Sequence, residues 1–132
     1  MGNLKLLLQK SDQLKLDVNA VDDIGETALM HACQSNDPQV IPPFLECVRS
    51  KGINVNAKDE FGRTAFICAC QHVMDYGEDS RIDILMDQAK DLNMDLMTRN
   101  YKDKTGFHKL SFETREKLRE KFPDLVPDEE LC

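Results

Sequence analysis

Apolar residues along the chain cluster in short blocks rather than alternating with polar ones. The blocks ALMHAC at 28–33 and AFICAC at 65–70 are small and almost wholly apolar, and each follows a polar hexapeptide. A longer amphipathic segment comes next in each case, at 43–51 and at 81–90. The alternating runs that half-buried strands require do not occur. The pattern therefore predicts an all-α fold of paired helices, a short buried helix followed by a longer one.

Local signals mark the expected ends of the two longer helices. Pro42 and Pro43 suit the first turn of the first one, where a backbone N–H would have no partner, and Gly52 suits its C-terminal end. Ser80, with Asp83 three residues later, forms a weak capping box at the start of the second one. These signals predict where the first of these helices begins and ends and where the second one begins.

The whole pattern repeats along the sequence. Threonines precede the apolar blocks at Thr27, Thr64 and Thr105, with spacings of 37 and 41 residues. A second marker, which reads DVNAVD, NVNAKD and DLMTRN, begins at positions 17, 54 and 95 and keeps the same two spacings. Two independent markers in one register indicate three copies of a structural unit. One unit cannot bury its apolar face alone, so the copies are expected to stack into a solenoid.

Each unit begins with the same turn chemistry. In the second copy, Asp59 can accept hydrogen bonds from the backbone that follows it, and Gly62 permits the positive φ of a tight turn. Thr64 stands where the N-cap of the next helix is expected. The first copy has the same residue types at the equivalent positions, which are Asp22, Gly25 and Thr27.

This order of turn, short helix, loop, longer helix and extended return resembles the ankyrin repeat family. Units of that family carry a Thr-Pro-Leu-His-x-Ala motif and average about 33 residues. The resemblance implies a short ankyrin-type solenoid of helix–turn–helix units with hairpin-like β-turn loops. It divides the chain into a partial N-terminal repeat at 1–21 (outer helix and return), repeats at 22–58 and 59–99, a degenerate repeat at 100–122, and an acidic tail at 123–132.

The copies depart from the family's motif in several places. Both full repeats exceed the family's period, and the extra residues are assigned to helix–helix loops, at SNDPQ (35–39) and HVMDYGEDS (72–80). In the third copy, Asp103 replaces the turn glycine and Leu110 replaces a small residue. The positions of the motif's Pro hold Ala28, Ala65 and Gly106, and those of its His hold Met30, Ile67 and His108.

The third copy has further expected features. The resemblance gives His108 a structural role, in which hydrogen bonds tie neighbouring turns together. The outer helix is expected in the segment SFETREKLREKF at 111–122. The side chains expected near one packed face of that helix are Phe112, Leu118 and Phe122.

Charge and composition exclude some partners. The chain has 132 residues, which is enough for one core, and a formal net charge of −7. A phosphate backbone would repel such a surface, so nucleic acid is not an expected partner. No stretch is long enough to span a bilayer, so a membrane is not expected either. Five cysteines without regular spacing favour reduced thiols in a cytoplasmic or nuclear protein, which we expect to be a monomer.

The residues that could support chemistry have structural interpretations. Cys68, Cys70 and His72, with His31 and Cys33 in the previous copy, are the ligand types of a zinc site. However, Cys68 and Cys70 are two residues apart and face different sides of a helix, so we interpret the cysteines as small buried residues. A Cys–His nucleophile would also need a third group and an oxyanion hole, which the pattern does not offer. We therefore expect no enzyme activity, catalytic residue, metal, cofactor or small-molecule substrate.

A binding surface remains. The resemblance implies that partners contact the turn tips and the exposed side of the first helix in each unit. Ile24 and Phe61 fall at equivalent tip positions, and Tyr101 lies one step out of that register. The expected partner-binding residues are Asp23, Ile24, Glu26, Gln34, Glu60, Phe61, Arg63, Gln71, Tyr101, Lys102 and Lys104, with Val21, Ser35, Lys58, His72 and Arg99 beside them.

The sequence thus predicts a non-catalytic module that binds another protein through its concave face. Acidic residues in the first two units and basic residues in the third suggest a partner with the opposite charge pattern. Two alternatives are a small regulatory subunit that inhibits or activates one enzyme or transcription factor, and a host-directed viral or bacterial effector. The acidic end of the chain is expected to be disordered or a terminal cap, and a short linear motif is the alternative.

Overall fold

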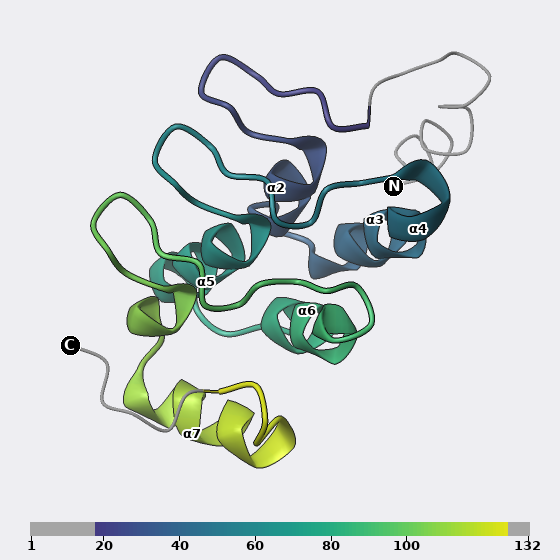
Figure 1. Ribbon diagram of the computed structural model, residues 1–132. Coiled ribbons are helices and arrows are strands. Elements are labelled where there is room, and N and C mark those ends of the chain that lie inside the picture. The colour runs from purple at the N-terminus through teal and green to yellow at the C-terminus, as the bar shows by residue number, and fades with distance from the viewer. Residues whose placement is uncertain (1–17, 127–132) are drawn as a thin grey trace.

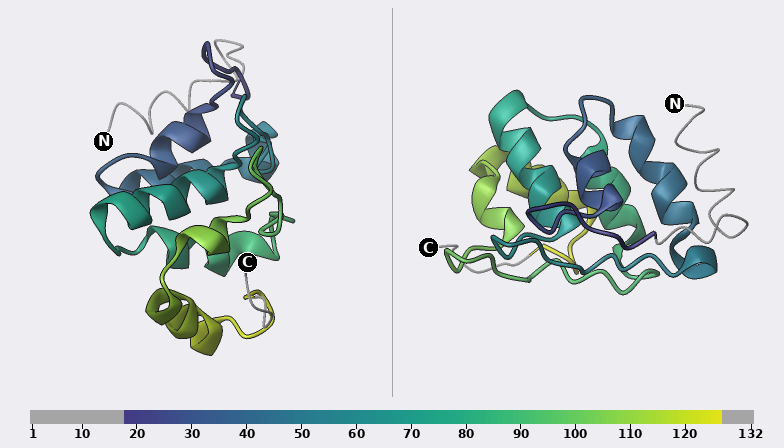
Figure 2. Two further views of the ribbon diagram at one scale, coloured as in Figure 1. Left: turned by 90° about the vertical axis from the view of Figure 1, so that its left-hand side faces the viewer. Right: turned by 90° about the horizontal axis from the view of Figure 1, so that it is seen from above.

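The computed structural model describes residues 18–126, and in it the helices stack in two columns with extended hairpins projecting to one side (Figures 1 and 2). The inner column consists of α2, α5 and η2, and the outer column of α3 with α4, then α6, then α7. The elements are α2 (Ala28–Cys33), η1 (Pro38–Val40), α3 (Ile41–Glu46), α4 (Val48–Lys51), α5 (Ala65–Tyr76), α6 (Arg81–Ala89), η2 (Gly106–Lys109) and α7 (Phe112–Lys121).

The fold is the all-α repeat solenoid that the sequence predicts. Within residues 18–126 the only β-type pairing is an isolated bridge between Val21 and Thr27. No helix in this part of the chain is long and apolar enough to cross a membrane. The predicted partial N-terminal repeat and acidic tail lie mostly in residues 1–17 and 127–132, which are outside the described residues.

The predicted turn and cap chemistry is confirmed in the first two units. Asp59 Oδ1 accepts hydrogen bonds from the N–H groups of Phe61 and Arg63, both at 2.9 Å. Thr64 caps α5 by accepting the N–H of Ile67. Asp22 and Thr27 make the equivalent bonds in the first unit. These side chains fix the shape of each hairpin from within its own sequence.

The third unit reproduces the hairpin with different residues. Asn100 takes the place of the aspartate, and its Oδ1 accepts the N–H groups of Lys102 and Lys104. Asp103 stands at the glycine position and adopts a positive φ of 62°. His108 Nδ1 accepts the N–H of Thr105 at 3.0 Å, a bond that lies within one unit.

Glycine at the hairpin turn serves two purposes in the second unit. Gly62 has a φ of 75°, which strains any residue with a side chain. A Cβ atom at this position would also lie 3.0 Å from the backbone nitrogen of Tyr101 in the next hairpin. The close approach of successive hairpins therefore depends on this glycine.

The second insertion lies mainly in a helix, and the prediction of a loop at 72–80 is wrong. Helix α5 continues to Tyr76, so it has 12 residues where α2 has six. Gly77, with a φ of 101°, ends the helix and leaves only a short loop before α6. In the first unit, by contrast, the segment 35–39 does lie between α2 and α3.

The longer helices differ from expectation in two details. The helix expected at 43–51 begins two residues earlier and is interrupted at Cys47, which separates α3 from α4. Ser80 makes no side-chain capping bond to α6, so the predicted capping box is wrong. Asp79 instead accepts the backbone N–H of Arg81 at 2.9 Å and also binds its guanidinium group.

Asparagine side chains link each return segment to the next. Asn19 donates to the carbonyl of Gly52 and accepts the N–H of Asn54, at 2.8 and 2.7 Å. Asn56 makes the same pair of bonds one unit later, to the carbonyl of Asn93 at 2.9 Å and the N–H of Asp95 at 2.7 Å. The asparagine of the repeated Asn-Ala marker therefore forms a ladder of hydrogen bonds, in which each rung is one asparagine side chain bound to two backbone groups of the next unit.

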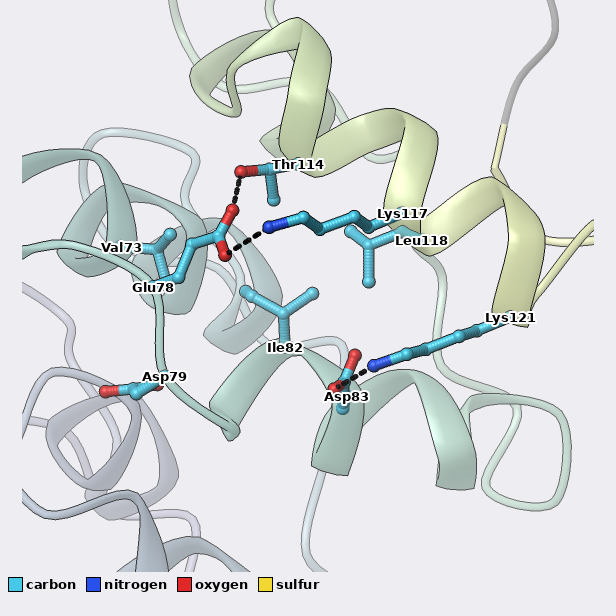
Figure 3. Close-up of a pocket in the computed structure, with 9 residues that line it drawn as sticks. All are labelled: Val73, Glu78, Asp79, Ile82, Asp83, Thr114, Lys117, Leu118 and Lys121. Carbon is cyan, nitrogen blue, oxygen red and sulfur yellow. Dashed lines mark hydrogen bonds and ion pairs between the residues drawn. The ribbon is translucent and has the colours of Figure 1, made fainter.

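The third unit packs through an apolar core and surface ion pairs. Phe107 on η2 lies against Phe66 on α5, with ring centroids 5.2 Å apart. Helix α7 buries Thr114 and Leu118, as predicted for Leu118. Phe112 is 71% exposed, so the prediction that it lies on the packed face of this helix is wrong. In Figure 3, Glu78 accepts a hydrogen bond from Thr114 and pairs with Lys117, and Lys121 reaches Asp83 at 2.8 Å.

Candidate functional site

The hairpin tips bring most of the predicted partner-binding residues into one row. Asp23, Glu60, Phe61, Tyr101 and Lys102 are exposed. A second group is partly buried and lies on the hairpins or at the inner helices. That group consists of Ile24, Gln34, Arg63, Gln71 and Lys104.

Successive hairpins stack with an offset of one residue. The N–H of Tyr101 donates to the carbonyl of Phe61 at 2.9 Å, and the N–H of Glu60 donates to the carbonyl of Ile24 at the same distance. The first residue after the turn aspartate or asparagine thus lies beside the second residue after the turn aspartate of the preceding unit. This offset explains why Tyr101, one step out of register in the sequence, pairs with Phe61.

Phe61 and Tyr101 form an exposed aromatic pair. Their ring centroids are 5.9 Å apart with the planes tilted by 51°. The two side chains are 39% and 66% exposed, and Val21 in the first hairpin is 58% exposed. Exposed aromatic groups on a rigid backbone are the residue types that dominate binding energy at protein interfaces.

A cationic side chain from the same hairpin lies near each ring of this pair. The Arg63 guanidinium carbon lies 5.4 Å from the Phe61 centroid, and Lys102 Nζ lies 5.6 Å from the Tyr101 centroid. The Arg63 charge is also matched by Asp59 Oδ2 at 2.7 Å. Lys102 contacts no carboxylate among the described residues, so its charge stays available to solvent.

Two of the predicted contact residues are buried. Glu26 is only 7% exposed, because Gln34 hydrogen-bonds to its carboxylate and Arg63 of the next hairpin lies 3.7 Å from it. The expectation that Glu26 lies on the open surface is therefore wrong. His72 is also only 7% exposed, and it packs on Tyr76 with ring centroids 4.7 Å apart.

The buried cysteines match their structural interpretation. Cys33, Cys68 and Cys70 are all fully buried in the inner helices. Burial raises the pKa of the Cys68 thiol to about 12, and it raises the pKa values of the other two thiols as well. Thiols in this environment stay protonated at neutral pH and are weak nucleophiles and metal ligands.

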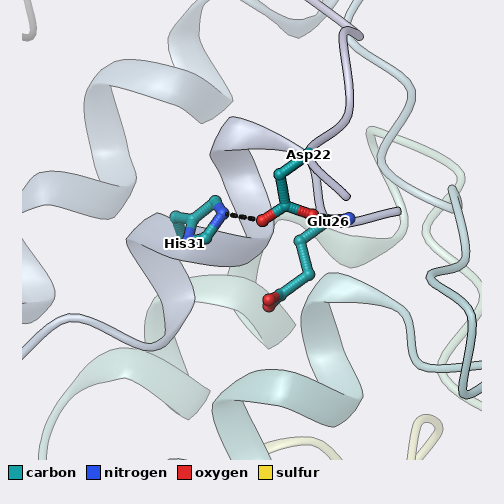
Figure 4. Close-up of side chains that lie close together, drawn as sticks. All are labelled: Asp22, Glu26 and His31. Carbon is teal, nitrogen blue, oxygen red and sulfur yellow. Dashed lines mark hydrogen bonds and ion pairs between the residues drawn. The ribbon is translucent and has the colours of Figure 1, made fainter. Parts of the chain in front are cut away.

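Two groups of possible metal ligands lie in the described residues. In the first, Figure 4 shows the His31 ring pointing at Asp22, with Nε2 and Oδ2 2.8 Å apart, and Glu26 close by. The other oxygen of Asp22 accepts two backbone N–H groups, and the bond to the N–H of Glu26 is the main cause of a lowered Asp22 pKa. These bonds give Asp22 a structural role in the hairpin.

The second group joins Glu26, Asp59 and Cys68, all of them buried. Arg63 already supplies the positive charge here, since its guanidinium contacts both carboxylates. The carboxylates of the two hairpins therefore bind a side-chain cation of this chain, and they connect the first unit to the second.

Comparisons with known proteins agree with this architecture. The family model for ankyrin repeats in three copies matches residues 2–99. Among solved structures, the chain is similar to the ankyrin repeat domain of Bcl-3, a member of the IkappaB protein family, with a TM-score of 0.59 and 23% sequence identity. The match covers 83% of this chain but only 41% of the Bcl-3 chain. A search of curated proteins finds no match. On the strength of the family match, the chain belongs to the ankyrin repeat family.

Proposed function

We propose that this protein is a non-catalytic interaction module that binds a partner protein through its hairpin tips. The contact region, which we name the tip surface, consists of Asp23, Ile24, Glu60, Phe61, Tyr101 and Lys102. The observation that supports the proposal best is the exposed Phe61–Tyr101 pair. Ankyrin repeats generally mediate protein–protein interactions, and the family membership points the same way.

The tip surface is organised before a partner arrives. Side-chain bonds from Asp59 and Asn100 hold two of the hairpins in shape, and backbone bonds connect each hairpin to the next. Binding to such a surface costs little conformational entropy, so a few apolar anchors can provide useful affinity. Phe61 and Tyr101 are the anchors in this proposal, and the charges around them select the partner.

The test is an affinity capture that compares two variants, each of which loses one phenylalanine and one tyrosine. The first is Phe61→Ser with Tyr101→Ser on the tip surface. The second is Tyr76→Ser with Phe112→Ser, whose side chains are 76% and 71% exposed and lie away from the hairpins. Circular dichroism first establishes that both variants keep the helical fold.

We expect one protein to bind the wild type at stoichiometric level, to be lost with the first variant and to be retained by the second. Loss with the second variant alone would place the binding site on α5 and α7 and contradict the proposal. A captured partner that is an enzyme or transcription factor, and whose activity changes on binding, would identify the chain as a regulatory subunit.

The proposed compartment is the reducing interior of a cell. Cys33, Cys68 and Cys70 are buried as free thiols, and Cys47 is also unpaired. Free cysteines in a folded protein favour an environment in which thiols stay reduced. Fractionation of cells that express the tagged full chain tests this point, and recovery from the secreted fraction would contradict it.

A further inference from the structure

The net charge of the hairpins changes steadily along the stack. The three equivalent hexapeptides are 21–26, 58–63 and 99–104. The first contains three acidic residues and no basic residue, the second contains two of each, and the third contains three basic residues and one acidic residue. The row of hairpins is therefore negative at one end, neutral in the middle and positive at the other.

Only some of these charges are accessible to a partner. In the first hairpin, Glu26 is buried and Asp22 is bound to His31 and to its own backbone, which leaves Asp23. In the third, Arg99 lies 3.8 Å from Asp103. Among the described residues, Asp23 and Lys102 contact no group of opposite charge, and both are exposed. Lys58 and Glu60 of the central hairpin are exposed as well, but they are opposite in sign and leave that hairpin without net charge.

The central hairpin separates these two charges with an apolar group. Phe61 lies at its tip, and Tyr101 leans back onto it from the third hairpin. The cation nearest to Phe61 is Arg63, which already faces Asp59 and Glu26. The net charge along the tips is therefore negative, then neutral around the aromatic pair, then positive.

We propose that the tip surface binds an extended peptide segment of a partner protein in one fixed orientation. This inference rests on the proposed function and specifies its ligand. The segment has a basic residue that faces Asp23, apolar side chains that pack on Phe61 and Tyr101, and an acidic residue that faces Lys102. Complementary charges at the two ends favour this orientation over the reversed one, because reversal places like charges together.

The test selects ligands from a library of random dodecapeptides displayed on phage. The baits are the full-length wild type and a charge-swapped variant that combines Asp23→Lys with Lys102→Glu. A third bait, Phe61→Ser with Tyr101→Ser, identifies peptides that bind elsewhere. Each bait is first checked by circular dichroism for an unchanged helical fold.

Wild type is expected to enrich peptides with an apolar centre, basic residues at one end and acidic residues at the other. The charge-swapped variant is expected to enrich the opposite order. A synthetic peptide from the wild-type selection should bind the charge-swapped variant about fivefold more weakly, as expected for exposed ion pairs. In NMR spectra, a spin label on the acidic end of the peptide should broaden the amide signals of Tyr101 and Lys102. A spin label on its basic end should broaden the amide signals of Asp23 and Ile24.

The outcomes separate this inference from the proposed function. One outcome is that the peptides require Phe61 and Tyr101 but have no fixed order of charges, or bind wild type and the charge-swapped variant equally. That outcome would overturn the proposed peptide orientation and leave the tip surface in place. Peptides that bind the aromatic-to-serine bait as well as wild type would overturn both. Failure to enrich any peptide would overturn the peptide ligand, while the capture experiment would still test the tip surface against a folded partner.

Discussion

The junction between the first and second repeats contains a buried cation, whereas the junction between the second and third has its ion pairs at the surface. Arg81 is fully buried and donates to the carbonyl of Cys33 at 2.6 Å, with Asp79 as its counter-charge. At the second junction, Lys117 and Lys121 are 56% and 58% exposed. Exposed pairs contribute little to stability, so the second junction depends on its apolar contacts.

The largest expected effect comes from Arg81→Ala. The substitution leaves the Cys33 carbonyl and the Asp79 carboxylate without their partner and opens a cavity next to α2. We expect a loss of about 3–5 kcal/mol in the free energy of unfolding. Urea denaturation followed by circular dichroism measures it. The control is Lys117→Ala at the other junction, and an equal loss in the two variants would remove the distinction between the junctions.

Leu118→Ala tests whether apolar contact holds the third repeat. Leu118 is 4% exposed and is one of only two residues that α7 buries. We expect a loss of about 2–3 kcal/mol, at the lower end of the range for such truncations because α7 lies at the edge of the described core. Hydrogen exchange should increase in α7 and η2 and stay unchanged in α2. Phe112→Ala, on the exposed face of the same helix, should change neither quantity.

Asn56→Ala removes one rung of the asparagine ladder. The N–H of Asp95 and the carbonyl of Asn93 both lose a partner, but both groups can turn to water. We therefore expect a smaller loss, of about 1 kcal/mol. Met97 occupies the equivalent position in the third unit and is 44% exposed. Met97→Ala is the matched control, and a loss there as large as with Asn56→Ala would show that the ladder contributes nothing.

The smallest expected effect is a pH dependence at the first junction. Desolvation lowers the pKa of His72 below 6.5, and the positive charge of Arg81 adds to this, although Asp79 and Asp75 oppose it. The unfolded chain therefore takes up a proton at a higher pH than the folded chain does, and stability falls as the pH drops below 6.5. Denaturation of wild type and His72→Phe at a series of pH values should show this loss in wild type only. Parallel curves for the two proteins would contradict it.

Sequence patterns predict local structure best in this protein. The caps at Thr27 and Thr64 and the turns at Asp22 and Asp59 could be predicted because each bond joins residues a few positions apart. The length of α5 could not be predicted from the repeat period, because an insertion can lengthen a loop or a helix. The available signal is Gly77, the first strong helix breaker after Thr64. After Cys33, polar loop residues and Pro38 follow at once.

The candidate site was predictable in part. The residue types at the tips are visible in the sequence, and five of the 11 predicted residues are exposed in the structure. The burial of Glu26 depends on Arg63, which comes from the next hairpin, and no pattern within one repeat reports such a contact. The pairing of Phe61 with Tyr101 likewise depends on the one-residue offset between stacked hairpins.

The asparagine ladder makes the second repeat a module that can be duplicated. A segment that runs from Asn54 to Met94 contains a donor to the preceding rung, the N–H of Asn54. It also contains Asn56, whose side chain donates to the carbonyl of Asn93 and accepts the N–H of Asp95 that follows the segment. A tandem copy inserted after Met94 would meet its neighbours through the same pair of side-chain bonds on both sides. Arg63 is the exception, since it would face another Arg63 in place of Glu26. Replacing the arginine of the inserted copy with glutamate would restore the pair, whereas replacing the original Arg63 would place a glutamate against Glu26. The array can therefore be lengthened only if the compensating substitution is made in the inserted copy.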